Sequence, residues 1–155
     1  MFSLLVGYQY RSAAVVSDQP APDDSDAVSL VDELGGQPGT RVPHVWVQHG
    51  GKRVSTLDLV GHDFTLLTGD GGAPWTEAAA SASAVLGIPI TVHRLGPAGD
   101  ARDPEGAWPQ ASGLESGGAL LVRPDDFVGW RAATLPQSPE NDLRRALCQI
   151  LGRAP

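Results

Sequence analysis

Apolar side chains recur along this chain at two spacings, and each spacing predicts a different element. Between residues 4 and 16, Val6, Tyr8 and Tyr10 alternate with other side chains before an apolar run, which indicates one or two strands. Further strands are expected at 44–47, 53–56, 64–69, 88–94, 118–124 and 127–132. Helical spacing predicts helices over 74–86 and 138–153, and shorter helical turns are expected at 57–61 and near 108–114.

Residues with known preferences at helix ends support the two helices. Pro74 fits the first position of the first helix, and Gly87 is typical of the residue that ends one. Glu77 is expected in the first turn, where a negative charge is favourable. Ser138 is expected to cap the second helix.

The order of the elements predicts a thioredoxin-like α/β fold. From residue 64 it is strand, helix, strand, long crossover, hairpin and helix. A strand–helix–strand unit is parallel with a right-handed crossover, and the hairpin adds antiparallel strands. One mixed sheet with helices packed on it is therefore expected. An earlier hairpin is predicted at Gly50-Gly51, which supply the positive φ angles of its turn.

The bend TLLTGDGGAPWTEAAA (65–80) joins a strand to a helix, a position that is able to cradle a phosphate. Its GDGGAP stretch lacks the third glycine of a dinucleotide-binding fingerprint, and the chain has no GK[ST] sequence. Asp70 and Glu77 flank the bend, and no lysine or arginine occurs from residue 54 to residue 93. Phosphate binding is disfavoured on both grounds.

The same bend is also the place where a thioredoxin carries its two cysteines. Residues 72–75 read GAPW, and residues 117–118 are two glycines where the thioredoxin family has a cis-proline. Cys148 is the only cysteine in the chain, so no internal disulfide is available. The sequence therefore predicts a thioredoxin-like sheet that lacks the redox CxxC, in which this bend is a corner of the fold.

Composition limits the partners and the compartment. The chain has 155 residues, 41% of them hydrophobic, and a net charge of −7. These values suit one folded domain, and the acidic balance argues against nucleic acid or an anionic membrane as partner. The start MFSLLVGYQYR resembles neither a signal peptide nor a membrane span. With a single cysteine, the chain is expected to be cytoplasmic.

Other candidate residues form no catalytic constellation, so no catalytic, cofactor-binding or metal-binding residue is assigned. His44 and His49 are expected on opposite faces of a strand, which disfavours metal binding, and His62 and Asp63 are interpreted as an ordinary loop pair. Ser12, Ser55 and the scattered acidic residues lack the spacing of a nucleophile and its base. Tryptophans are expected to be packing residues: Trp46, Trp75, Trp108 and Trp130.

Several stretches, in order, resemble the C-terminal region of FAD-dependent aromatic hydroxylases of the phenol hydroxylase and polyketide hydroxylase type. They are GYQYRSAAVV (7–16), PGTRVPHVWV (38–47), STLDLVGHDFTLLTG (55–69), Trp75 and GALLVRPDDFVGWRA (118–132). The likeness covers nearly the whole chain. Asp126 departs from it, since the family usually has glycine there, and this leaves the type of turn open.

The resemblance implies a division of labour in the parent enzyme. The preceding parts would bind FAD and the aromatic substrate and use NAD(P)H, whereas the C-terminal thioredoxin-like domain would support the fold or the subunit contacts. Residues 1–16 would be the tail of the preceding substrate region, 17–37 an acidic loop or linker, and 38–155 the thioredoxin-like domain. No flavin-binding or catalytic motif of the family occurs in this chain.

Two functions remain open from the sequence: a non-catalytic C-terminal domain of such a monooxygenase, or a free-standing thioredoxin-like module that binds a separate protein. A coding frame for the FAD-binding part directly upstream of Met1 would favour the first. Tyr8, Tyr10 and Arg11 are the candidate residues for contacts with the preceding domain or with a second copy in a homodimer, because a strand that has lost its neighbour exposes apolar side chains and an edge.

Overall fold

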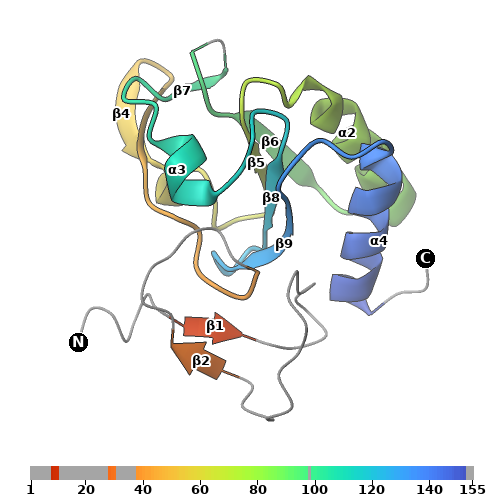
Figure 1. Cartoon of the computed structure of the whole chain (residues 1–155). Coiled ribbons are helices and arrows are strands. Elements are labelled where there is room, and N and C mark those ends of the chain that lie inside the picture. The colour runs from red at the N-terminus through yellow and green to blue at the C-terminus, as the bar shows by residue number, and fades with distance from the viewer. Residues whose placement is uncertain (1–7, 11–27, 31–37, 98, 153–155) are drawn as a thin grey trace.

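A four-stranded mixed sheet forms the centre of the computed structural model, which describes residues 8–10, 28–30, 38–97 and 99–152 (Figure 1). Its strand order is β6 (Ile90–Arg94), β5 (Phe64–Thr68), β8 (Ala119–Val122) and β9 (Val128–Ala132). β5 and β6 are parallel, whereas β8 is antiparallel to both of its neighbours. This is the thioredoxin-like arrangement that the element order predicts.

Two helices cover one face of this sheet. α2 (Ala73–Leu86) connects β5 to β6, and α4 (Pro139–Leu151) follows β9 and lies beside α2 (Figure 1). Strand side chains that point to this face pack against the apolar faces of both helices, because alternate residues of a strand face opposite sides. The buried members of this core include Leu66, Trp75, Leu121, Leu143 and Leu147.

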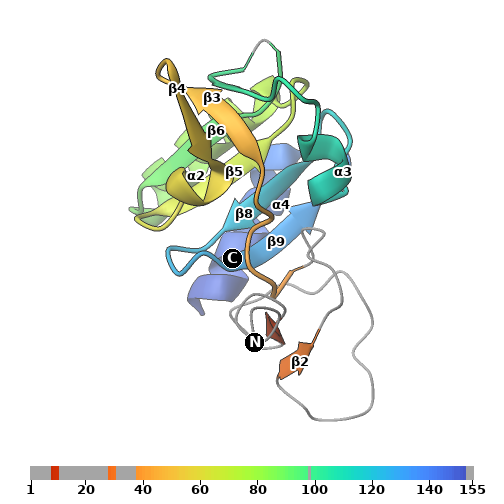
Figure 2. The same cartoon turned by 90° about the vertical axis from the view of Figure 1, so that its left-hand side faces the viewer.

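A second layer covers the opposite face, as the view in Figure 2 shows. It contains an antiparallel sheet in the order β4 (Lys52–Ser55), β3 (Trp46–His49) and β7 (Ala101–Arg102), together with the 3₁₀ turn η1 (Thr56–Asp58) and the short helix α3 (Trp108–Ser112). The core of this layer includes Val47, Leu67, Trp108, Leu120 and Val128. The central strands are thus buried on both faces.

Both helices and all strands expected from residue 44 onward are confirmed, with shifted ends. The hairpin glycines Gly50 and Gly51 have φ angles of 60° and 77°, as predicted. β7 lies in the Gly- and Pro-rich segment for which no strand was expected. β1 (Tyr8–Tyr10) pairs antiparallel with β2 (Val28–Leu30), so a strand lies within the segment interpreted as an acidic loop or linker.

Some expectations about single residues are wrong. α2 begins one residue before Pro74, and this places Glu77 beyond the first turn. Ser138 occupies the cap position of α4, but its side chain makes no capping hydrogen bond. Trp75 and Trp108 are buried, whereas Trp46 is 44% exposed and its ring lies under the guanidinium of Arg53. No helix among the described residues is long and apolar enough to cross a membrane.

Candidate functional site

The corner between β5 and α2 is closed by the segment that precedes β8. The Gly71 amide N–H donates to the carbonyl of Ser116 (3.0 Å) and to its side-chain oxygen (2.9 Å). The indole N–H of Trp75 donates to the carbonyl of Gly117 at 2.8 Å, and the Thr68 hydroxyl donates to the carbonyl of Gly118 at 2.6 Å. These hydrogen bonds connect residues 68–75 to residues 116–118. In a thioredoxin, the two corresponding segments carry the redox site.

There is no room for side chains where these two segments meet. A Cβ atom placed on Gly72 would lie 2.1 Å from Oγ1 of Thr68, and one on Gly118 would lie 2.5 Å from the carbonyl oxygen of Ala133. Gly72 is the first of the four residues that correspond to CxxC, so even a restored cysteine would not fit there. Cys148 lies buried in α4. The predicted turn from a strand into a helix at this bend is confirmed.

A small cleft of about 180 Å³ lies next to this corner. Its lining residues include Asp70, Leu95, Trp108, Leu114 and Ser116. The volume is below the roughly 300–1,000 Å³ typical of sites for drug-sized ligands and cofactors. The cleft therefore suits neither FAD nor a polycyclic aromatic substrate.

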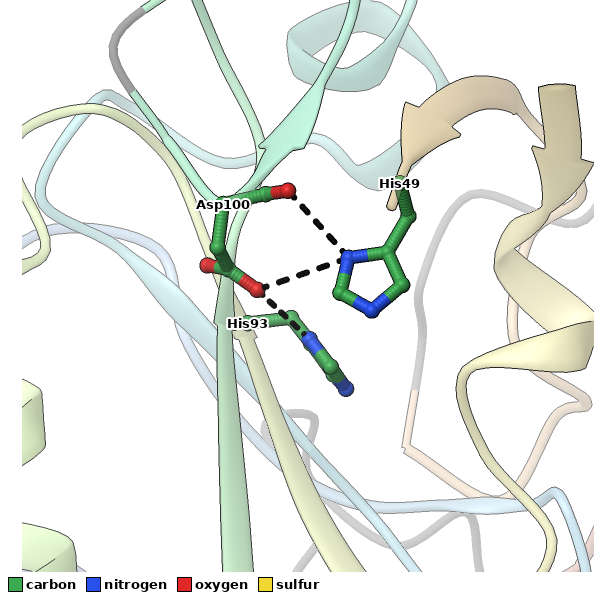
Figure 3. Close-up of side chains that lie close together, drawn as sticks. All are labelled: His49, His93 and Asp100. Atoms are coloured by element: carbon green, nitrogen blue, oxygen red, sulfur yellow. Dashed lines mark hydrogen bonds and ion pairs between the residues drawn. The ribbon is translucent and has the colours of Figure 1, made fainter. Parts of the chain in front are cut away.

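A cluster of titratable side chains is formed by His49 at the end of β3, His93 in β6 and Asp100 just before β7 (Figure 3). Asp100 Oδ2 lies 2.8 Å from Nδ1 of His93 and 3.9 Å from Nδ1 of His49. The main-chain oxygen of Asp100 is 3.2 Å from the same nitrogen of His49. The two imidazole rings meet edge to face, with their centroids 5.3 Å apart.

The local backbone holds Asp100 in this position. The Arg94 amide N–H donates to Asp100 Oδ1 at 2.7 Å. Partial burial acts to raise the pKa of the Asp100 carboxyl, but this hydrogen bond and the contact with His93 outweigh it, so the pKa lies below its ordinary value. A Cβ on Gly99 would lie 1.9 Å from the Arg94 carbonyl oxygen, so only glycine allows the loop to pass this close to β6.

Sequence reasoning missed this cluster because its members come from three separate segments. In the sequence, the histidine considered together with His49 is His44. In the structure, His44 forms a hydrogen bond with Ser55 and packs against Trp46. No spacing in the sequence connects the three residues. The pairing of His49 with Ala101 places His49 beside Asp100, and the Asp100 carboxylate in turn contacts His93 in β6. His44 is not part of the cluster.

The candidate contact residues lie in or beside β1. Tyr8 and Tyr10 stand opposite Leu30 and Val28 in the ladder with β2. Arg11 lies outside the described residues, as does most of the segment 1–16. The structure therefore leaves their role in contacts with another domain or a second copy as a prediction.

Comparisons with known proteins agree with the fold. The model of the family described as aromatic-ring hydroxylase, C-terminal, matches residues 35–154. The chain is 45% identical over 148 residues to tetracenomycin A2 monooxygenase-dioxygenase of Streptomyces glaucescens, covering 95% of this chain and 26% of that protein. It is 45% identical over 145 residues to 2,4-dichlorophenol 6-monooxygenase of Delftia acidovorans, covering 92% and 25%.

A solved structure shows the same architecture. The crystal structure of aklavinone-11 hydroxylase with FAD and aklavinone matches with a TM-score of 0.85 at 40% identity, over 97% of this chain and 27% of that one. The closed corner and the strand order define the chain as a thioredoxin-like domain without a redox dithiol. It belongs to the family of C-terminal domains of aromatic-ring hydroxylases. The chain spans about a quarter of the length of the curated relatives it matches.

Proposed function

We propose that this chain is the non-catalytic C-terminal structural and interaction domain of an FAD-dependent aromatic-ring monooxygenase, working in the cytoplasm. Its relatives are named as monooxygenases, and the chain corresponds to about a quarter of each. In this proposal the parts that precede the chain bind FAD, NAD(P)H and the aromatic substrate. Residues 38–155 would form the domain, 1–16 the end of the substrate region, and 17–37 the connection.

The closed corner carries the non-catalytic part of this proposal. It occupies the position at which the fold supports redox chemistry, and backbone carbonyls and a buried indole fill it. The adjacent cleft is too small for a flavin. A domain with a well-packed core on both sides of its sheet, and with a single cysteine that is buried, is suited to support a larger enzyme.

A chimera tests this proposal. The homologous C-terminal quarter of the relative aklavinone 12-hydroxylase of Streptomyces purpurascens is replaced by this chain, and a second protein simply lacks that quarter. The chimera is expected to retain bound FAD and aklavinone hydroxylation, whereas the truncated protein should lose FAD or aggregate. The isolated chain should be colourless after gel filtration. A truncated enzyme with full FAD content and activity, or an isolated chain that binds FAD stoichiometrically, would contradict the proposal.

The second candidate is a free-standing thioredoxin-like module that binds a separate protein without redox activity. The fold alone supports this module as strongly as it supports the monooxygenase domain, since the closed corner fits both candidates. The coding sequence directly upstream of Met1 distinguishes them. An uninterrupted frame for an FAD-binding part supports the monooxygenase domain, and an isolated gene supports the module.

We propose in addition that Tyr8, Tyr10 and Arg11 contact the preceding domain or a second copy of the chain. An apolar strand edge that lacks its neighbour favours self-association, and a symmetric dimer is the commonest closed form. Deletion of residues 1–16 should shift the isolated chain toward monomer in sedimentation experiments without unfolding it. Equal masses for the two proteins would contradict this role.

A further inference from the structure

Two imidazoles and a carboxylate meet where the two sheets of the domain approach each other (Figure 3). We propose that His49, His93 and Asp100 bind one divalent first-row transition-metal ion, with Zn²⁺ as the expected ion. This proposal revises the expectation from sequence that the chain has no metal ligand. It rests on these three side chains alone and is independent of the monooxygenase proposal.

The separations between the ligand atoms fit one small ion. Zinc bonds to nitrogen and oxygen are about 2.0–2.2 Å, so a tetrahedral zinc ion holds its ligand atoms roughly 3.3–3.5 Å apart. The distances from Asp100 Oδ2, 2.8 Å to His93 Nδ1 and 3.9 Å to His49 Nδ1, lie on either side of this value. One ligand atom from each residue lies within 4.8 Å of the others. Small side-chain rotations are therefore sufficient to enclose the ion.

The surroundings of Asp100 prepare its carboxylate as a ligand. The Arg94 amide N–H holds Oδ1, which leaves Oδ2 directed at the two imidazoles. Such hydrogen bonds to ligating groups orient them and support metal affinity. Without metal, Nδ1 of His93 is able to donate its proton to Asp100. Metal binding requires that this proton move to Nε2 or be released to water.

The donor set selects the class of ion. Two nitrogens and one oxygen suit Zn²⁺ and its neighbours in the transition series, whereas Mg²⁺ and Ca²⁺ prefer oxygen ligands only. The side chains of His49 and Asp100 are 41% and 45% exposed, so water has access to the remaining coordination positions. The net charge of −7 also favours a cation over an anion.

An ion at this place would join the two layers of the domain. His49 belongs to β3 in the three-stranded sheet and His93 to β6 in the four-stranded sheet, while Asp100 lies in the loop between β6 and β7. The ion would therefore hold three segments that are distant in sequence. Because it binds the folded chain and not the unfolded one, it should raise the thermal midpoint.

Calorimetric titration of the full chain with ZnCl₂, after removal of any affinity tag and treatment with chelator, tests the proposal. We expect one Zn²⁺ per chain and a higher thermal midpoint that is reversed by EDTA. In NMR spectra the imidazole signals of His49 and His93 should shift on binding, while those of His44 and His62 should not. This readout requires no variant.

Variants locate the site. Asp100→Asn and His93→Gln keep a polar side chain of similar size and should each weaken Zn²⁺ affinity at least about tenfold, since even the loss of an outer partner of a ligand costs that much. His62→Ala is the matched control, because His62 is an exposed histidine outside the cluster. Absence of saturable binding at submillimolar Zn²⁺, unchanged affinity in both cluster variants, or equal loss in His62→Ala would each overturn the proposal.

Discussion

Replacement of Gly72, the residue that precedes α2, by alanine should destabilise the domain. Gly72 has a φ of −88°, which alanine adopts without strain. Because alanine restricts the unfolded chain, this effect alone would raise the free energy of unfolding by about 0.4–1 kcal/mol. The new methyl group, however, would lie 2.1 Å from Oγ1 and 2.3 Å from Cγ2 of Thr68. Thr68 is fully buried, and its hydroxyl donates to the Gly118 carbonyl, so a change of its side-chain conformation has a cost.

The size of the effect follows from two costs. Overpacking of a tight core costs about 1–3 kcal/mol. If Thr68 turns away, its hydrogen bond to the Gly118 carbonyl is lost, and the unpartnered buried carbonyl costs about 1–3 kcal/mol. Either cost, after subtraction of the gain in the unfolded chain, means that Gly72→Ala should lower the free energy of unfolding by about 1–2 kcal/mol.

Urea unfolding of single and double variants isolates the cause. In a Thr68→Ala background two of the three close contacts disappear, so the effect of Gly72→Ala should fall by at least about 1 kcal/mol. Gly87→Ala is the control, because Gly87 has open space around it but a φ of 69°. Its cost of about 1–2 kcal/mol should be the same in both backgrounds. An equal effect of Gly72→Ala with and without Thr68 would refute the steric argument.

Three other predictions concern single side chains. Trp75→Phe removes the donor to the Gly117 carbonyl and should lower the free energy of unfolding in urea by about 1–3 kcal/mol. The loss should exceed that of the control Trp130→Phe, because Trp130 is partly exposed, and equal losses would count against a special role for this hydrogen bond. Asp126→Gly should be more stable than Asp126→Ala by about 1–2 kcal/mol in the same assay, because φ at this residue is 72°. Both variants lose the contact with Arg41, so the comparison isolates the backbone conformation, and identical midpoints would contradict this reasoning. Cys148 is 2% exposed and should react with a thiol reagent only after unfolding, and the chain should not reduce insulin; rapid labelling of the folded chain would show the reasoning wrong.

Local signals in the sequence were sufficient for the sheet and its helices. The run 64–69 is apolar enough to predict a strand buried on both faces, and β5 has this environment. Gly50-Gly51 and Gly87 have the positive φ angles that a hairpin turn and a helix end require. Asp126 also has a positive φ, 72°, a conformation that glycine adopts more readily than aspartate.

Features that depend on contacts between distant segments were not predictable. β7 has two residues, too few for a period, and forms only because β3 offers it an edge. Trp46 was expected in a core, but it sits on the outer face of a hairpin, where a neighbouring arginine covers it. The cluster of His49, His93 and Asp100 needs the same pairing of β3 with β7, so no reading of single segments would reveal it.

The burial of β5 and β8 on both faces has a consequence for how the domain comes apart. Leu66 and Leu67 are adjacent in sequence, yet one belongs to the core under the helices and the other to the core under the second sheet. Neither layer is able to open without exposing the strands that the other layer needs. The two layers should therefore unfold as one cooperative unit, and the amide protons of β5 and β8 should be the last to exchange with solvent.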